Sequence, residues 1–375
     1  MQWETRYKMK NIILFGLGQM GKKLIDECLN YEMNIALKAI ADNNASESFY
    51  RNIPVIKPRE IKEYCYDEIW ICTVYFKEIM EQLSCDYGID KETMFFVEPV
   101  VPVLESRLRQ KYKMQLKNSN SVSGEVDEVL GYLKNHHLRM YCYPFFDEYL
   151  QKNTEIQYDN VKGLYYGIYE NKKMYLARRF NTLEKARAYF NAVIMEQDMR
   201  SPHCYWNNEK LSKIDGVGVD VGAAEGIFAL KIIEKIKHIY LIEVDEQWIE
   251  ALQYTFEDYT DKITVINTYI GNEDGEGKAR LDTVLLDAKI DFIKMDIEGM
   301  EYEALRGAEK ILSNNDVQLA ICVYHHQDDN EKIGQWLRDR KYYTINSKGL
   351  VVCQGDWELE KDETDFRKAL LFANK

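Results

Sequence analysis

Short apolar runs alternate with stretches of helical periodicity along the C-terminal half of the chain, residues 215–375. Short apolar runs are typical of buried strands, and apolar residues that recur every three or four positions are typical of helices. Strands are predicted near residues 217–221, 239–244, 263–267, 291–296, 318–324, 342–346 and 368–373. Helices are predicted near residues 227–236, 246–257, 300–313 and 330–340, and a short polar segment, Gly271–Gly277, stands where another helix is expected. This alternation predicts a doubly wound α/β fold that binds ligands at the carboxyl ends of a mostly parallel sheet.

A smaller version of the same pattern occupies roughly residues 10–100. A predicted strand ending at Phe15 runs into a Gly-x-Gly-x-x-Gly loop, a helix follows, and the next strand ends in an acid. This order meets the structural context that a dinucleotide-binding motif requires. The candidate residues of this second nucleotide site are Gly16, Gly18, Gly21 and Asp42. The sequence therefore predicts an N-terminal Rossmann-like α/β domain, which either binds NAD or a nucleotide-sugar or serves without a ligand as a docking module.

The residues between these two patterns are predicted to form a helical and hairpin connecting region that covers a cofactor. Its expected elements are helices over Val103–Leu116 and Val126–Leu138, a polar linker over Asn118–Gly124, and a hairpin within Ile156–Phe180. Asn181 and Glu184 are predicted to cap a further helix that ends near Met199. The predicted domains are residues 1–102, 103–205 and 206–375.

Composition narrows the class of partner. The net charge of −13 and the pI near 5.2 argue against a nucleic-acid partner, because phosphate binding relies on clustered Lys and Arg. No apolar run approaches the ~20 residues that span a bilayer, and the first ten residues lack the apolar core of a signal peptide. Eight cysteines occur without a Cys-x-x-Cys pair, and we expect them to be reduced core residues of a cytoplasmic protein rather than disulfides or metal ligands.

The segment Val217–Leu230 combines a predicted strand, a loop with Gly222 and Gly226, and the start of a helix. Glycine permits backbone conformations with positive φ and lets the chain approach a ligand closely. The next predicted strand ends in Glu243, where an acid can accept hydrogen bonds from ribose hydroxyls. These two features fit NAD, FAD or S-adenosylmethionine equally well.

A second acidic strand end decides between these cofactors. Lys294, Asp296, Glu298 and Glu301 crowd the end of the strand near residues 291–296. With the Asp-x-Gly-Ala-x-x-Gly loop and the acid at 243, this Lys-x-Asp-x-Glu-Gly-x-Glu pattern resembles the FkbM-type methyltransferase family. The segments that also match are Leu281-Asp282, Leu305–Ala308, Tyr324-His325 and Glu196-Gln-Asp-Met-Arg-Ser-Pro-His203. The resemblance covers roughly residues 125–375, and the N-terminal region is similar to nucleotide-binding-like domains of bacterial sugar-modifying enzymes.

The resemblance implies S-adenosylmethionine as cofactor and a sugar hydroxyl of a bacterial surface glycan or glycoside as methyl acceptor. It also implies cofactor contacts, which on this chain are Asp220, Gly222, Ala223, Glu225, Gly226 and Glu243. Asp198 and His203 belong to the segment before the first strand of the second pattern. They either contact cofactor or acceptor, or they cap the preceding helix and hold Pro202 in place.

Methyl transfer to a hydroxyl needs alignment and a group that removes the proton. We predict His325 as the general base, because it follows a strand that opens toward the cofactor and imidazole titrates near neutrality. Asp296 would orient the substrate and Lys294 would neutralise it. Alternatively, Asp296, Glu298 and His325 would bind a divalent metal ion. Glu301 is expected to be an ordinary acid in the first turn of a helix.

Two other functions compete with this interpretation. An NAD-dependent sugar oxidoreductase would use the N-terminal domain and needs a Tyr–Lys pair. Tyr158 and Lys162 have that spacing, but they lie in a strand-like stretch and not in a helix. A non-catalytic nucleotide-sugar-binding protein would not need an intact glycine loop with Glu243. The expected partner is a small molecule or glycan, and the oligomeric state is not predicted.

Overall fold

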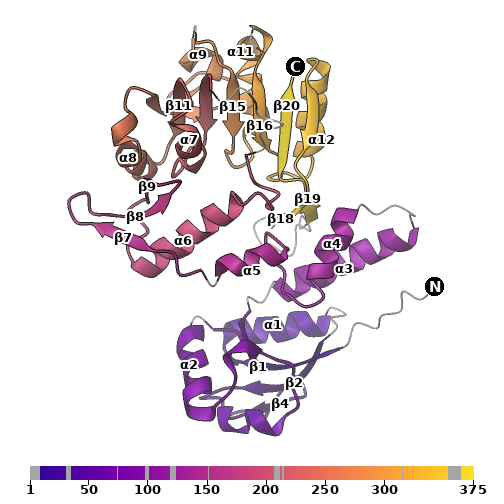
Figure 1. The fold of residues 1–375 in the computed structure, drawn as a ribbon. Helices are drawn as coiled ribbons and strands as arrows, with labels where there is room; N and C mark the ends of the chain where they lie inside the picture. Colours follow the sequence, from indigo (N-terminus) through magenta and orange to yellow (C-terminus); the bar gives the residue numbers. More distant parts are fainter. Residues whose placement is uncertain are drawn as a thin grey trace. The chain divides into compact units, whose positions relative to one another are not determined.

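The computed structural model describes residues 9–30, 35–73, 75–97, 101–118, 124–150, 152–206, 212, 215–286, 288–314, 316–353 and 365–375. Residues 1–8 at the start and residues 119–123 of the predicted linker lie outside the described residues. The chain forms two compact units: the first contains the described residues up to Arg139, and the second those from Met140 onward (Figure 1). The connecting region predicted over residues 103–205 is therefore shared between both units.

The first unit is built on a six-stranded sheet with the order β3-β4-β2-β1-β5-β6, in which only β3 is antiparallel to its neighbour. Its strands are β1 (Lys10–Phe15), β2 (Ile35–Ala41), β3 (Phe49–Tyr50), β4 (Ile53–Ile56), β5 (Glu68–Ile71) and β6 (Met94–Phe96). Its helices are α1 (Gln19–Asn30), α2 (Phe76–Tyr87), α3 (Val101–Asn118) and α4 (Gly124–Tyr132), with short 3-10 turns at Pro58–Glu63 and Lys91–Thr93. The predicted mixed α/β architecture of this region is confirmed, whereas β3, which has two residues, and β4, which contains Pro54, are not predicted from the sequence.

Both faces of this sheet are covered. Ile12 and Leu14 pack on the side of α1, and Ile13 and Phe15 pack on the side of α2. Alternate residues of a strand face opposite sides of a sheet. A strand buried on both faces therefore reads as the continuous apolar run seen before the first glycine loop.

The Gly-x-Gly-x-x-Gly loop of the first unit is held largely by its own contacts. One Asp42 carboxylate oxygen accepts a hydrogen bond from the Leu17 amide at 2.8 Å, and the other accepts two amides that follow the aspartate itself. Burial opposes the charge of Asp42, but these backbone hydrogen bonds lower its pKa. Gly16 has a φ of 105°, and a Cβ added at Gly21 would lie 1.8 Å from the Gly16 carbonyl oxygen. Three of the four candidate residues thus have structural roles, and nucleotide binding by this loop stays a prediction.

The second unit contains a seven-stranded sheet with the order β12-β11-β10-β15-β16-β20-β17. Its strands are β10 (Val217–Val221), β11 (His238–Glu243), β12 (Ile263–Asn267), β15 (Phe292–Met295), β16 (Gln318–Cys322), β17 (Tyr343–Asn346) and β20 (Leu370–Asn374). The first five are parallel to one another, and β20 runs antiparallel between β16 and β17. The predicted doubly wound α/β fold is confirmed.

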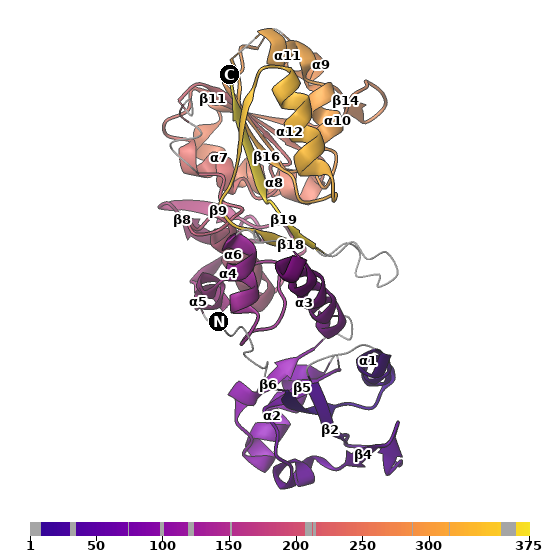
Figure 2. The same ribbon diagram turned by 90° about the vertical axis from the view of Figure 1, so that its right-hand side faces the viewer.

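Helices pack on both faces of this sheet, with α7 and α8 on one side and α10 and α12 on the other (Figure 2). The helices are α7 (Ile227–Ile232), α8 (Glu246–Thr255), α9 (Leu281–Val284), α10 (Glu301–Arg306), α11 (Glu309–Asn314) and α12 (Asp329–Asp339). The single helix predicted over 300–313 is therefore wrong, because the backbone breaks at Gly307, which packs tightly against the Gly271 carbonyl. The trimmed crossover after β12 is confirmed: the short strands β13 (Tyr269–Ile270) and β14 (Lys278–Ala279) pair there.

The remaining elements of the second unit are α5 (Pro144–Leu150), the sheet β7 (Ile156–Asp159), β8 (Leu164–Tyr169) and β9 (Lys172–Tyr175), helix α6 (Leu183–Glu196), and the pair β18 (Val351–Cys353) and β19 (Asp365–Arg367). The hairpin around residues 170–173 is confirmed and has a third strand. The predicted cap at Asn181 is wrong by one residue, because Thr182 accepts the hydrogen bond of the Lys185 amide. None of the helices that the structure describes has the length and apolar character of a membrane span.

The first glycine loop generates a paired stability prediction. Gly21→Ala should destabilise the protein by about 1–3 kcal/mol, the usual cost of overpacking, because its Cβ would clash with the Gly16 carbonyl. Gly18→Ala is the matched control, since nothing lies within 4 Å of a Cβ at that position, and it should stay within about 0.5 kcal/mol of the parent. Denaturant unfolding of the full chain measures both, and equal stability of the two variants would contradict the proposed packing role.

Candidate functional site

A cavity of about 730 Å³ opens at the carboxyl ends of β10, β11 and β15 in the second unit. Side chains from α6 and from the segment around residues 203–205 also line it. The predicted cofactor contacts Gly222, Ala223, Glu225 and Glu243 are all among the lining residues. Asp220 lies fully buried beneath them and Gly226 closes the loop at the start of α7.

The glycines of this loop are required by the fold itself. Gly222 and Gly226 have φ values of 77° and 78°. A Cβ on Gly222 would lie 1.9 Å from the backbone oxygen of Asp296, and one on Gly226 would meet Leu252 and Phe256. Packing therefore requires glycine at both positions, and a ligand contact of the loop stays a prediction. Ligand contacts of the loop would come from its exposed backbone and from the side chains between the glycines.

Glu243 anchors the loop to the tip of β11. One of its carboxylate oxygens accepts the Ala224 amide at 2.8 Å, and the other accepts the amides of Val244 and Asp245 at 2.7 and 2.9 Å. A carboxylate offers about four lone-pair positions, so acceptor capacity is left for a hydroxyl in the cavity. Glu243 can thus hold the loop and bind a ligand at the same time.

Lys294 and Asp220 form a buried ion pair below the loop. The Lys294 ammonium lies 3.0 Å from an Asp220 oxygen and donates to the Gly222 carbonyl at 2.6 Å. Burial opposes the charge, but Asp220 and Asp296 raise the pKa of Lys294 above its usual value. The contacts found for Lys294 are thus structural, and the neutralising role in catalysis assigned to it from the sequence stays a prediction.

Two acids on the cavity wall have pKa values raised close to neutral pH. Glu225 accepts a hydrogen bond from the Tyr189 hydroxyl at 2.6 Å, and burial raises its pKa to about 7. Burial and the nearby charges of Glu225 and Asp296 raise the pKa of Glu196 to about 8. Both residues line the cavity, so its charge becomes more negative across the neutral pH range.

Asp296 stands between two histidines at the end of β15. It accepts a hydrogen bond from the Tyr205 hydroxyl at 2.7 Å. The Nε2 atom of His203 lies 3.7 Å from its Oδ2, and the Nε2 atom of His325 lies 3.6 Å from its Oδ1. Burial alone would raise the pKa of Asp296, but the charges of Lys294 and the two imidazoles lower it to about 2. The carboxylate is therefore ionised at every physiological pH.

His325 is oriented by an acid that we had interpreted as an ordinary helix residue. Its Nδ1 atom lies 3.1 Å from an oxygen of Glu301, which is fully buried and accepts the Ile297 amide. Its Nε2 atom faces Asp296 and also lies 3.6 Å from Glu298. Burial alone would lower the pKa of His325, yet Glu301 and then the other two carboxylates raise it. The expectation for Glu301 was incomplete, because its carboxylate also orients the histidine.

The segment before β10 contains two predicted site residues, His203 and Asp198, and the structure places them differently. His203 is buried, lines the cavity, and has its pKa lowered to about 4 by burial. Asp198 instead accepts hydrogen bonds from Arg200 and Tyr149, and it is not among the residues that line the described cavity. These contacts support the alternative in which Asp198 organises the end of α6. A contact between Asp198 and the cofactor stays a prediction.

Tyr189 and Tyr205 are cavity residues that sequence analysis missed. Their hydroxyls bind acids that lie 36 and 91 positions away in the sequence. Local periodicity carries no signal for such contacts. Glu301 was visible only as the last acid of the Lys-x-Asp-x-Glu-Gly-x-Glu pattern, and its burial follows from packing.

Two family matches cover separate parts of the chain. Residues 276–343 match the methyltransferase FkbM domain, and residues 8–95 match the C2185-like N-terminal family. The first match includes Lys294, Asp296, Glu298, Glu301 and His325 and begins after the glycine loop and Glu243. The second match does not support the nucleotide-binding role expected for the N-terminal region. No curated protein matches the chain.

Solved structures of several methyltransferases are similar to this chain at low sequence identity. An FkbM methyltransferase from Methylobacillus flagellatus KT shares 18% identity, with a TM-score of 0.39 over 98% of this chain and 90% of that chain. A precorrin-6y C5,15-methyltransferase from Geobacter metallireducens GS-15 shares 15% identity, with a TM-score of 0.31 over 44% and 87% of the two chains. TrmK from M. capricolum, in complex with S-adenosylhomocysteine, shares 15% identity, with a TM-score of 0.29 over 44% and 67%.

The FkbM match lies in the second unit and contains the acidic end of β15, which forms one wall of the cavity, together with the histidine that faces it. The family match and the cavity beside it together identify the chain as an S-adenosylmethionine-dependent methyltransferase.

Proposed function

We propose that the second unit transfers a methyl group from S-adenosylmethionine to a hydroxyl of a sugar, as in the synthesis of a bacterial surface glycan or glycoside. The observation that carries the hydroxyl acceptor is the Glu301–His325 pair: His325 is not among the residues that line the described cavity, but its Nε2 atom lies 3.6 Å from Asp296, which is. A hydroxyl is a weak nucleophile until its proton is removed, and an oriented imidazole is suited to that task. The sugar class rests on the family resemblance.

The residues of the cavity fit S-adenosylmethionine by charge. This cofactor supplies a methyl group on a positively charged sulfonium. Glu196, Glu225, Glu243 and Asp296 line the cavity, and the lysine and the arginine in the lining, Lys294 and Arg179, are already paired with Asp220 and Asp245. Opposite charges in a partly buried site attract strongly. Glu243 would accept the ribose hydroxyls, and Glu196 with Glu225 would face the cationic part of the cofactor.

The acceptor end of the cavity is aromatic and acidic. Tyr205 and Tyr324 line it, and the ring of His203 lies 5.1 and 5.4 Å from theirs. Aromatic faces with a few fixed polar groups are typical of sites for small polar ligands. In this proposal Asp296 accepts a hydrogen bond from the acceptor, and Glu301 fixes His325 so that Nε2 receives the acceptor proton.

Two alternatives from the sequence are an NAD-dependent sugar oxidoreductase and a metal site at Asp296, Glu298 and His325. Tyr158 lies in β7 and Lys162 in the following turn, so the pair lacks the helix that a short-chain dehydrogenase needs. The sugar oxidoreductase is disfavoured for that reason. His325 lies 3.6 Å from both Asp296 and Glu298, but the set whose ligand atoms all lie within 4.8 Å of one another contains Glu301 in place of Glu298, and Glu298 is 92% exposed. This metal site and the cytoplasmic location stay predictions from the sequence.

The cofactor assignment predicts that Glu243→Ala weakens S-adenosylmethionine binding. The variant loses a charge-assisted hydrogen bond and the anchor of the loop, so the loss should be about 1–3 kcal/mol. Isothermal titration measures the affinity. Glu246→Ala is a matched control, because Glu246 is an exposed acid at the start of α8 and does not line the cavity. Equal affinities for Glu243→Ala and the parent would remove Glu243 from the site.

The raised pKa values of Glu196 and Glu225 predict that cofactor binding depends on pH. With values of about 8 and about 7, both acids are partly protonated near pH 7. A bound cation favours their charged forms, so binding should release protons and affinity should rise as pH increases from about 6 to 8. Titration in buffers of different ionisation enthalpy counts the released protons. Glu196→Gln and Glu225→Gln should each release fewer, and unchanged release in both would refute the assignment.

The base assignment predicts separate effects for His325 and Glu301. His325→Ala should lower turnover by about 10²–10⁴-fold and leave cofactor affinity nearly unchanged, whereas exposed His326→Ala should retain turnover. In the parent, activity should rise with pH through a midpoint above the ordinary value of about 6.5, because the raised pKa keeps His325 protonated longer. Glu301→Gln should shift this midpoint to lower pH. A purely structural Glu301 would leave the midpoint in place.

A further inference from the structure

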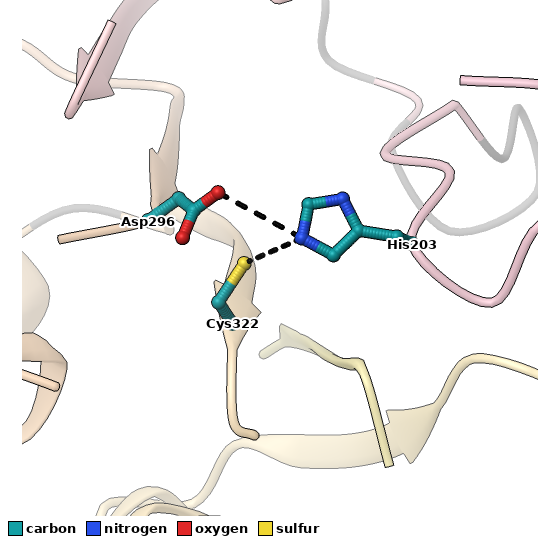
Figure 3. A group of neighbouring side chains, drawn as sticks. All are labelled: His203, Asp296 and Cys322. Carbon is teal, nitrogen blue, oxygen red and sulfur yellow. Dashed lines mark hydrogen bonds and ion pairs between the residues drawn. The ribbon is translucent and has the colours of Figure 1, made fainter. Parts of the chain in front are cut away.

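A second cluster of side chains with metal-ligand chemistry lies around the Asp296 oxygen that does not face His325, and its members His203 and Asp296 line the cavity. Nε2 of His203 lies 3.4 Å from Sγ of Cys322 and 3.7 Å from Oδ2 of Asp296 (Figure 3). The three atoms all lie within 4.8 Å of one another. We propose that His203, Asp296 and Cys322 bind one divalent transition-metal ion, with zinc the best fit. Cys322 is a free and fully buried core cysteine, as the sequence predicts, and the proposal departs from that prediction only in giving this residue a metal.

The spacing of the cluster suits a tetrahedral ion. Zinc binds sulfur at about 2.3 Å and imidazole nitrogen or carboxylate oxygen at about 2.0–2.2 Å. Ligand atoms at the corners of such a tetrahedron are roughly 3.3–3.6 Å apart. The two distances from His203 are close to this range, and the remaining pair of ligand atoms lies within 4.8 Å.

The three ligands come from separate parts of the second unit, and two of them lie at the ends of neighbouring strands. Asp296 and Cys322 follow the register pair Met295 and Ile321 on the neighbouring strands β15 and β16. His203 comes from the segment after α6 and is held in place by the rings of Tyr141, Tyr205 and Tyr324 around it. Ligands on neighbouring strands are positioned more accurately than ligands on loops.

The chemistry of the set favours a soft or borderline ion over magnesium or calcium. A thiolate with an imidazole and a carboxylate is typical of zinc sites, whereas magnesium and calcium prefer oxygen ligands. Cys322 is fully buried and His203 is nearly so. The Tyr205 hydroxyl binds the same Asp296 oxygen that faces His203. Such an outer-shell hydrogen bond orients a metal-ligating carboxylate.

The fourth coordination position would open onto the cavity. His203 and Asp296 line that cavity, and zinc sites with three protein ligands and one open position are typical of catalysis. The open position would hold the acceptor hydroxyl and lower its pKa, and His325 on the other oxygen of Asp296 would accept the proton. This role rests on the proposed function, whereas metal binding itself does not.

Cobalt titration tests the site without cofactor or acceptor. After removal of metal with a chelator, the full-length protein should bind one Co²⁺ and show a thiolate-to-cobalt charge-transfer band. Cys322→Ser should lose this band. Cys72→Ser, which removes a buried cysteine of the first unit, should keep it. His203→Gln should weaken Co²⁺ binding at least as much as the about 10–100-fold typical of a lost outer-shell partner.

The competing set of Asp296, Glu301 and His325 gives the opposite result. His325→Gln should leave the cobalt spectrum intact if the ion sits on His203 and Cys322. Loss of binding in His325→Gln with retention in Cys322→Ser would overturn the proposal, as would a parent protein that binds no Co²⁺. X-ray absorption of the zinc-loaded parent needs no variant and should find one sulfur at about 2.3 Å among nitrogen and oxygen ligands. Binding of the ion without methyl transfer would reject the proposed function and leave the metal site in place.

Discussion

The buried contact of Lys294 with Asp220 and the Gly222 carbonyl is the interaction on which the site depends. Asp220 and Lys294 are direct register partners on the central strands β10 and β15, and both are almost completely buried. Removing one partner of such a pair leaves an uncompensated charge and typically costs about 3–5 kcal/mol. The same ammonium fixes the first glycine of the cofactor loop. Sheet centre and loop are thus joined by one side chain.

Lys294 also influences the charge of Asp296, at the end of the cavity where the methyl acceptor is proposed to bind. Alternate residues of a strand face the same side, so Lys294 and Asp296 both face the cavity from the end of β15. One buried cation therefore serves two carboxylates, and it helps to hold the pKa of Asp296 low. The Lys-x-Asp spacing in the sequence is a direct consequence of this shared face.

Fold class was predictable because its signals are local. Strands buried on both faces gave continuous apolar runs, such as the one that ends at Phe15, and crossover helices gave amphipathic stretches. The errors have local causes as well. A strand of two residues such as β3 has no periodicity, and neighbouring Asn181 and Thr182 can both serve as caps, so only the folded backbone chooses Thr182.

The site was predictable only in part, because its contacts join distant residues. The glycine loop and Glu243 lie within one βαβ unit and are recognisable from spacing alone. The contact of His203 with Cys322 spans 119 positions, and that of Tyr205 with Asp296 spans 91. No pattern in the sequence links such pairs. The glycines show a different limit: their positions were recognised from spacing, but the close approach of the Asp296 backbone to Gly222 is visible only in the fold.

Asp296 explains how two histidines at one strand end acquire opposite properties. Each histidine lies within 4 Å of one of its oxygens, so this carboxylate alone would raise both pKa values. His203 is buried more deeply, among aromatic rings, and the positive charge of Lys294 also disfavours its protonation. Its pKa is therefore lowered to about 4. His325 has Glu301 on its other nitrogen, so its pKa rises. At neutral pH His203 therefore keeps a free lone pair while His325 can hold a proton, and this difference fits the proposal that the first binds a ligand and the second removes a proton.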